Sequence, residues 1–428
     1  MIKALKKIVI WILQMESRLV LKKYKPKIVA ITGSVGKTSA KDAIYEVLST
    51  SFLVRKSKKS YNSEIGIPLT ILGKDTGWNS VWAWITIIFE GIALLLFKNH
   101  YPKWLILEVG ADRPGDIKKV SKWLKPDVVV VTRFGDVPVH VEFFNSPEDV
   151  VKEKSYLVSA LKKNGVLIIN NDDKKTLSMK NKFDGMVMTY GFEKGSAFFA
   201  SKDNIVYKKE VPSGVSFKID YKGKSMPVTI SGVLGRQHIY SALAGFSVGA
   251  YLDINMVKMA QATEAHVGAP GRMKIIKGIK NTCIIDDTYN ASPVAMEAAL
   301  ETLRDVKTAG KKIAVLGEML ELGEYTNEEH KKIGKIAGEV CDLVLAVGIR
   351  SRGLIDGALI GGLNEKNIIE FKDSRKAGKY LEHVLKDRDV VLVKGSQGIR
   401  MERTVAEIMA HPQRKAELLV RQEPEWVA

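Results

Sequence analysis

Residues 27–39 have the sequence KIVAITGSVGKTS, and this stretch decides the fold class. Its first part, residues 27–31, is a short apolar run rich in β-branched residues, which is typical of a buried strand. The segment that follows it repeats apolar residues at helical spacing, namely Ala40, Ala43, Ile44, Val47 and Leu48. A strand, a glycine-containing loop and a helix in this order indicate an α/β nucleotide-binding unit.

The loop between this strand and helix has the chemistry of a phosphate-binding loop. Gly33 and Gly36 allow backbone N–H groups to point at phosphate oxygens at a helix N-terminus. Lys37 would reach the β- and γ-phosphates, and the hydroxyl of Thr38 would bind Mg²⁺. The general P-loop has another glycine five residues before Gly36, where this chain has Ile31. We predict ATP binding by Gly33, Ser34, Val35, Gly36, Lys37, Thr38 and Ser39, against the alternative of a simple glycine turn.

Apolar runs alternate with helical patterns through the rest of the chain. They predict strands at 104–109, 127–132, 166–169, 282–285, 312–316, 343–347 and 389–393. Alternating polarity over 196–230 predicts antiparallel hairpins, and the glycines and proline of 265–272 predict a boundary. The predicted fold is α/β, with a mostly parallel sheet plus a small antiparallel part and then a Rossmann-like sheet. Its parts are a basic N-terminal segment 1–25, a central P-loop domain 26–267 and a C-terminal domain 268–428.

Composition narrows the class of protein. The chain has 428 residues, of which 46% are hydrophobic and 27% charged, so general disorder is excluded. Its net charge of +18 favours anionic partners. The basic residues are scattered without the aromatic pattern of single-strand binders, so no nucleic acid is expected. The two cysteines, Cys283 and Cys341, lie in apolar surroundings, which excludes a disulfide framework or thiolate metal site and favours the cytoplasm.

Two segments depart from the α/β pattern. Residues 1–27 carry eight basic residues and one acidic residue, and their apolar run is too short for a membrane span or a signal peptide. They predict a helix that lies on a membrane surface or packs on the next domain, and both alternatives stay open. Residues 81–97, VWAWITIIFEGIALLLF, contain a single charge at Glu90. They predict a helix that is buried or lies on a membrane, rather than one that spans it.

Several motifs beyond the P-loop resemble the Mur ligase family of ATP-dependent amide-forming enzymes. They lie at 61–70, 107–117, 285–293, 314–323 and 393–403, and the last three are most similar to the type that adds D-alanyl-D-alanine. The resemblance covers about residues 26–410. It implies a cytoplasmic, monomeric ligase of peptidoglycan synthesis that uses ATP and Mg²⁺. Its substrates would be a UDP-linked muramoyl tripeptide and D-alanyl-D-alanine, joined through an acyl phosphate.

The resemblance also assigns roles to single residues. Lys37, Glu108, His140 and Lys154 would be catalytic, and Lys154 would carry a carbamate, with Lys152 as the alternate. Two Mg²⁺ ions would be held by Thr38, Glu108, His140 and Lys154. For Glu108 the alternative is a salt bridge or a helix cap, because a buried strand-end carboxylate needs a partner. Asn62, Arg272, Asp287 and Tyr289 would bind the nucleotide, and Lys394, Ser396 and Arg400 would lie near the incoming amine.

The chain also departs from the family pattern. Serines replace the usual asparagines at Ser63, Ser241 and Ser292, which puts nucleotide contacts there, and beside Gln237 and His238, in doubt. Only residues 1–25 stand where the family has its UDP-sugar domain, and an apolar insertion occupies 78–100. An alternative is therefore a membrane-associated ligase that acts on a lipid-linked or other carboxylate. A third possibility is a nucleotide-binding scaffold without catalysis.

Overall fold

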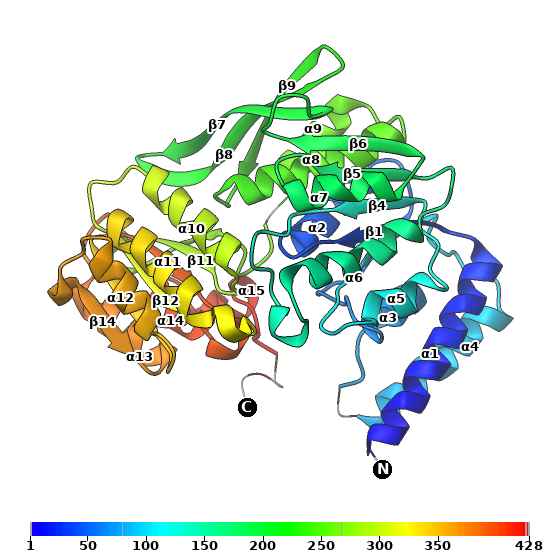
Figure 1. Ribbon diagram of the computed structural model, residues 1–428, viewed down its shortest axis with the longest axis horizontal. Coiled ribbons are helices and arrows are strands. Elements are labelled where there is room, and N and C mark those ends of the chain that lie inside the picture. The colour runs from blue at the N-terminus through cyan, green and yellow to red at the C-terminus, as the bar shows by residue number, and fades with distance from the viewer. Residues whose placement is uncertain (1, 79, 267, 424–425, 427–428) are drawn as a thin grey trace.

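The computed structural model describes residues 2–78, 80–266, 268–423 and 426, with side chains from Lys6 onward. Two sheets divide the chain (Figure 1). The first has nine strands in the order β2-β3-β1-β4-β5-β6-β7-β8-β9, and the second has six in the order β10-β11-β15-β12-β13-β14. The predicted boundary residue Val267 and the last two residues, 427–428, lie outside the described residues.

The first sheet is centred on β1 (Lys27–Thr32), which pairs in parallel with β3 (Trp104–Glu108) and β4 (Val128–Val131). Its other strands are β2 (Val54–Lys56), β5 (Val166–Asn170), β6 (Met186–Gly191), β7 (Phe198–Lys208), β8 (Val211–Tyr221) and β9 (Lys224–Ser231). Strands β7, β8 and β9 form the antiparallel part predicted from the alternating polarity.

Helices cover both faces of the first sheet, which explains why its central strands are apolar throughout. Val29 and Ile31 pack in one core with α2 (Lys37–Ser49), α8 (Arg236–Tyr251) and α9 (Met256–Glu264). Ile28 and Ala30 face the opposite core. That core is formed with α1 (Ile2–Tyr24), α3 (Gly66–Leu72), α4 (Val81–Leu96), α5 (Asp116–Ser121), α6 (Pro147–Ser159) and α7 (Lys174–Ser178).

The second sheet is mixed, because its edge strand β10 (Lys274–Lys277) runs antiparallel to β11 (Cys283–Asp287). The parallel strands are β11, β15 (Val390–Lys394), β12 (Lys312–Gly317), β13 (Leu343–Val347) and β14 (Ile368–Phe371). The helices are α10 (Pro293–Asp305), α11 (Thr326–Val340), α12 (Arg352–Ile360), α13 (Ser374–Val384), α14 (Glu402–Ile408) and α15 (Lys415–Leu418). Both cysteines are free and buried as predicted, and burial raises the pKa of each thiol to about 12.

The two segments that departed from the α/β pattern form the helices α1 and α4, which lie side by side at the edge of the molecule away from the second sheet (Figure 1). One face of α1 packs on the body, since Leu13, Ser17 and Val20 are fully buried. Among its residues, helix α4 buries only Ile87 and Gly91. The predicted burial inside the protein therefore applies to one edge of this helix, and most of its apolar side chains are not buried. In the described part of the chain, no helix combines the length and the apolar character that crossing a bilayer requires.

A buried carboxyl group lies where α1 meets α4. Glu16 faces Gly91, where an added Cβ would lie 2.3 Å from the carboxylate Oε2, so a larger residue at position 91 would displace this carboxylate. Neither Glu16 oxygen has a hydrogen-bond partner among the described residues, and burial raises the pKa of Glu16 from 4.5 to about 7. Between these two values the folded chain binds more protons than the unfolded chain, so its stability falls as the pH rises through this window.

We expect Glu16→Gln to stabilise the protein above pH 7, by roughly 1–3 kcal/mol, because it removes the cost of ionising this group. The midpoint of thermal unfolding, measured from pH 5 to pH 8, should depend less on pH in the variant than in the parent protein. The matched control is Glu90→Gln, because Glu90 lies on α4 at the surface and pairs with Lys74 at 2.8 Å. Identical pH profiles for the parent protein and Glu16→Gln would contradict the raised pKa of Glu16.

Candidate active site

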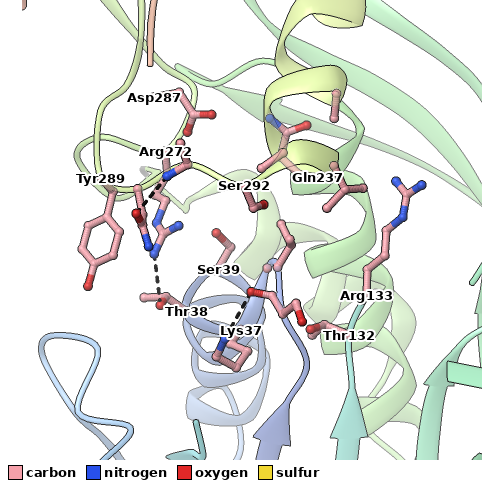
Figure 2. Close-up of a pocket in the computed structure, with 18 of the residues that line it drawn as sticks. Lys37, Thr38, Ser39, Thr132, Arg133, Gln237, Arg272, Asp287, Tyr289 and Ser292 are labelled. Carbon is pink, nitrogen blue, oxygen red and sulfur yellow. Dashed lines mark hydrogen bonds between the residues drawn. The ribbon is translucent and has the colours of Figure 1, made fainter. Parts of the chain in front are cut away.

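A cleft of 1610 Å³ lies between the two sheets. Its walls are formed at the carboxyl ends of five strands, β1, β3 and β4 of the first sheet and β11 and β15 of the second. Residues at or just after the last residue of each of these strands line the cleft. Every residue predicted for the site lines this cleft except Gly33, the first glycine of the P-loop, and the alternate Lys152. The fold thus gathers residues that are far apart in the sequence into one place (Figure 2).

The P-loop conformation depends on its two glycines. Gly33 has φ 134°, and a Cβ there would lie 2.0 Å from the hydroxyl of Thr132 at the end of β4. Gly36 has φ 84° and precedes α2, whose N-terminus has no side-chain cap. The N–H groups of Ser34 and Val35 donate to the carbonyl of Arg133 at 2.8 and 3.0 Å. The loop is therefore fixed to β4, and the uncapped helix N-terminus opens onto the cleft as an anion site.

Lys37 lies half-buried at the base of this anion site. Its Nζ donates to the carbonyls of Gly33 at 2.9 Å and Ser34 at 3.3 Å. Burial lowers the pKa of Lys37, and the charge of Glu108 opposes that shift. A cation whose hydrogen-bond partners are neutral carbonyls is strongly stabilised when a phosphate binds, because the phosphate supplies the negative charge that these partners lack.

Glu108 ends β3 as a buried carboxylate surrounded by neutral donors. It accepts hydrogen bonds from Thr38 at 3.0 Å, Ser60 at 2.6 Å and Asn62 at 3.4 Å. Among the described residues no cation lies within salt-bridge distance of it, so the salt-bridge alternative is wrong. The side-chain oxygens of Glu108 and Thr38 lie together beside the anion site, and such oxygens are the ligands that Mg²⁺ prefers. This pair therefore fits a magnesium ion.

Lys41, one turn into α2, was not predicted to belong to the site. Its side chain is fully buried, and its Nζ donates to the carbonyls of Ser57 at 2.9 Å and Lys59 at 3.1 Å. It therefore holds the loop that carries Ser60 to Glu108. A lysine at helical spacing among apolar residues is the one signal that could have revealed this role.

Lys154 lies on α6 and contacts the first two residues of the P-loop, Gly33 and Ser34. Its buried Nζ donates to the carbonyl of Gly33 at 2.9 Å and to the hydroxyl of Ser34 at 3.3 Å. Burial, together with the nearby charge of Lys37, holds the pKa of Lys154 well below its usual value. The alternate Lys152 is exposed on the same helix, so Lys154 is the lysine that the fold brings to the site.

His140 joins the two halves of the cleft. Its Nδ1 lies 2.6 Å from the carboxylate of Glu321, and its Nε2 lies 3.6 Å from that of Asp112. The close approach of the His140 ring lowers the pKa of Glu321. The described residues contain no group of three or more His, Cys, Asp and Glu side chains placed to hold a metal. The residues predicted to bind metal therefore do not all meet at one point. His140 pairs with the carboxylates of Asp112 and Glu321, whereas Thr38 and Glu108 contact each other.

Arg272 reaches across the cleft from the second half of the chain (Figure 2). Its guanidinium lies 3.9 Å from the ring centroid of Tyr289, and its Nη2 donates to the hydroxyl of Thr38 at 3.3 Å. Its buried Nε has no partner among the described residues. A stacked guanidinium with a free donor beside the P-loop suits a phosphate oxygen.

The other predicted residues of the second half are held by internal contacts. Lys394 pairs with Asp287 at 2.6 Å, and Asp287 also accepts from the N–H of Met273. The hydroxyl of Ser396 accepts from the N–H of Leu320 at 2.9 Å, and Arg400 pairs with Glu402 at 2.6 Å. These side chains form part of the wall of the cleft, and some of their hydrogen-bonding groups are already paired within the protein.

Helix α8 supports Arg272 through a histidine whose role the sequence did not reveal. The Nε2 of His238 lies 2.8 Å from the carbonyl of Arg272. Burial lowers the pKa of His238 to about 4, so the ring is neutral at pH 7 and Nε2–H donates. Nearby, the hydroxyl of Ser241 donates to the carbonyl of Gln237 at 2.9 Å, while the buried Oε1 of Gln237 has no partner in the described part of the chain.

We expect His238→Phe to raise the KM for ATP about tenfold, because the carbonyl of Arg272 loses its buried donor and the guanidinium loses its position. His238→Gln keeps a donor and should restore most of the affinity. Steady-state kinetics with varied ATP measure this effect, and a change in kcat alone, with KM unaltered, would show that His238 does not position Arg272.

Two family profiles match the chain. The Mur ligase middle domain matches residues 91–249, and the Mur ligase glutamate ligase domain matches residues 271–397. Together they cover more than half of the chain. The first match begins inside α4, so the P-loop lies before it.

Similar proteins extend this comparison over most of the chain. The UDP-N-acetylmuramoyl-tripeptide–D-alanyl-D-alanine ligase of Bacillus subtilis is 27% identical over 401 residues, which are 94% of this chain and 79% of that protein. The crystal structure of MurF ligase from Thermotoga maritima in complex with ADP is 26% identical, with a TM-score of 0.75 over 93% of this chain and 83% of that one. MurF from Acinetobacter baumannii has the same fold, with a TM-score of 0.75 at 23% identity over 92% of this chain and 79% of that one.

Proposed function

The chain belongs to the Mur ligase family of ATP-dependent ligases, and on this basis we propose that it joins D-alanyl-D-alanine to UDP-N-acetylmuramoyl-tripeptide. The observation that carries the proposal is the meeting of Lys37, Glu108 and Arg272 in one cleft, with the P-loop below and the second half of the chain above. We propose that 26–267 act as the ATP-binding domain and 268–428 as a domain that closes over it.

The reaction needs an activated carboxylate, because forming an amide in water is unfavourable. The carboxylate oxygen of the tripeptide attacks the γ-phosphorus of ATP, and ADP leaves. The amine of D-alanyl-D-alanine then attacks the acyl phosphate, and phosphate leaves with the formation of the amide. The N-terminus of α2, Lys37 and Arg272 would hold the phosphates in line and neutralise their charge. Thr38 and Glu108 would hold a Mg²⁺ ion, which supplies further positive charge to the phosphate oxygens when bound.

For Lys154 we propose a carbamate. Burial favours the neutral amine, and the neutral amine is the form that attacks the carbon of CO₂. An N–C bond forms, a proton is lost, and the cationic side chain becomes an anion with two oxygens. These oxygens would be available to a second Mg²⁺ beside the P-loop. The proposal is supported by the low pKa and by the absence of a carboxylate partner for this Nζ among its hydrogen bonds.

The test is phosphate release from ATP and Mg²⁺ by the full chain with UDP-N-acetylmuramoyl-tripeptide, with and without D-alanyl-D-alanine. Release that requires both substrates, and a product heavier by the dipeptide in mass spectrometry, would establish the activity. Binding of ATP without release on this substrate pair would contradict the proposed acceptor. A lipid-linked muramoyl peptide, tested under the same conditions, would then identify the alternative.

A further inference from the structure

Helices α1 and α4 each expose an apolar stripe. On α1, Ile8, Trp11, Met15 and Leu19 are exposed at spacings of three and four residues. On α4 the exposed residues Trp82, Ile85, Phe89, Ile92 and Leu96 repeat in the same way. Several of these side chains are exposed over most of their surface, with 78% for Trp82, 72% for Leu96 and 67% for Phe89.

The two stripes lie on the same side of the helix pair. The helices run in the same direction, because Glu16 faces Gly91 while Lys23 donates to the carbonyls of Leu94 and Leu95 near the end of α4. At about 100° per residue, each stripe points opposite the buried edge of its helix. On α4 the buried residue Gly91 contacts Glu16, so its stripe points away from α1, whereas the stripe of α1 lies roughly 90° around the helix from Glu16. Together the two stripes form the exposed apolar face of the helix pair, which we call the α1–α4 face.

Positive charge lies at both ends of the α1–α4 face. Lys6 and Lys7 are exposed at the start of α1, and Lys22, Lys25 and Lys98 are exposed beyond the other ends of the stripes. The acidic residues of the pair are removed from it, because Glu16 is buried and Glu90 pairs with Lys74. A flat apolar face that carries tryptophan and is bordered by lysine complements an anionic lipid surface.

From this juxtaposition we propose that the α1–α4 face docks the protein on an anionic lipid bilayer, with both helices lying in the plane of the interface. Helix α4 has 16 residues and is about 24 Å long, shorter than the hydrocarbon core of about 30 Å, so it lies along the bilayer and does not cross it. The face is on the side of the first sheet away from the second (Figure 1), so docking leaves the cleft between the sheets open. This proposal is independent of the ligase substrate.

The test is flotation of the purified full chain with vesicles of phosphatidylcholine alone or mixed equally with phosphatidylglycerol. We expect binding to the anionic vesicles that weakens in high salt. The charge variant Lys6→Gln/Lys7→Gln/Lys22→Gln should bind roughly a hundredfold more weakly, at about fivefold per lysine. The apolar variant Trp82→Gln/Phe89→Gln/Leu96→Gln should lose binding as well. The control Lys331→Gln/Lys335→Gln/Lys379→Gln changes exposed lysines of the second half and should bind like the parent protein.

Three results would overturn the proposal. They are equal binding to neutral and anionic vesicles, unchanged binding of the charge and apolar variants, and self-association in light scattering that the apolar variant abolishes without any vesicle binding. The last result would identify the α1–α4 face as a contact between copies of the chain. Ligase activity on soluble substrates without vesicles is measured in parallel, because the substituted residues lie outside the cleft. Failure of the docking proposal is therefore distinct from failure of the proposed reaction.

Discussion

Lys37→Met is expected to lower kcat/KM for ATP by 10³-fold or more, on the order of the effect of a cation on a transferring phosphoryl group. Among the described residues the Nζ of Lys37 is bound only to the carbonyls of Gly33 and Ser34, so it is the cation of the P-loop that a phosphate would engage. Methionine fills the same space without the charge. Phosphate release with both substrates measures the loss.

Two comparisons make this result specific. Lys163→Met changes an exposed lysine outside the cleft and should leave kcat/KM unaltered. The thermal midpoint of Lys37→Met should not fall, because burial already disfavours the charge of this lysine. A variant that unfolds would not test the role, so Lys37→Arg, which keeps the charge with a different shape, is measured beside it. Full activity of folded Lys37→Met would overturn the role of Lys37.

Lys154→Met is expected to lower kcat by on the order of 10²–10³-fold, comparable to the loss of one charge-stabilising group from an active site. The matched control is Lys152→Met, because Lys152 lies two residues earlier on α6 and is exposed. Since CO₂ reacts with the neutral amine, the parent protein in CO₂-free buffer should lose activity and regain it with bicarbonate. The Lys154→Met variant should not respond to bicarbonate.

The carbamate has a readout that does not depend on activity. In ¹³C-labelled bicarbonate the parent protein and Lys152→Met should show a carbamate carbon signal by NMR, and Lys154→Met should not. A large loss of activity in Lys154→Met without any carbamate signal in the parent protein would leave Lys154 as a structural support of the P-loop through Gly33 and Ser34. That outcome would overturn the carbamate proposal and keep the site.

Patterns within short segments predicted most of the fold. The strands predicted at 27–31, 104–109 and 343–347 agree with β1, β3 and β13 to within one residue at either end. Each is buried on both faces, so its residues are apolar throughout and the signal is strong. The strands that were missed, β2, β6, β10 and β14, are short or half-buried, and their mixed composition does not distinguish them from loops.

The candidate site was predictable to the extent that its residues belong to motifs. The P-loop, Glu108, Lys154 and Arg272 were all predicted, and the structure brings them to one cleft. The partners of those residues were not predicted. Ser60, Lys41 and His238 are each bound to a segment 16 or more residues away, and only Lys41, a lysine among the apolar residues of its helix, carries a local signal of its contact.

The sequence by itself determined the α/β class, the phosphate-binding loop and the amphipathic character of α1, because backbone freedom at glycine and the period of apolar residues are local properties. Only the tertiary structure decided which carboxylates His140 meets, which lysine of α6 reaches the P-loop, and that the stripes of α1 and α4 form one face. These outcomes depend on the packing of elements that are dozens or hundreds of residues apart, where burial and charge are set by the neighbours that folding supplies.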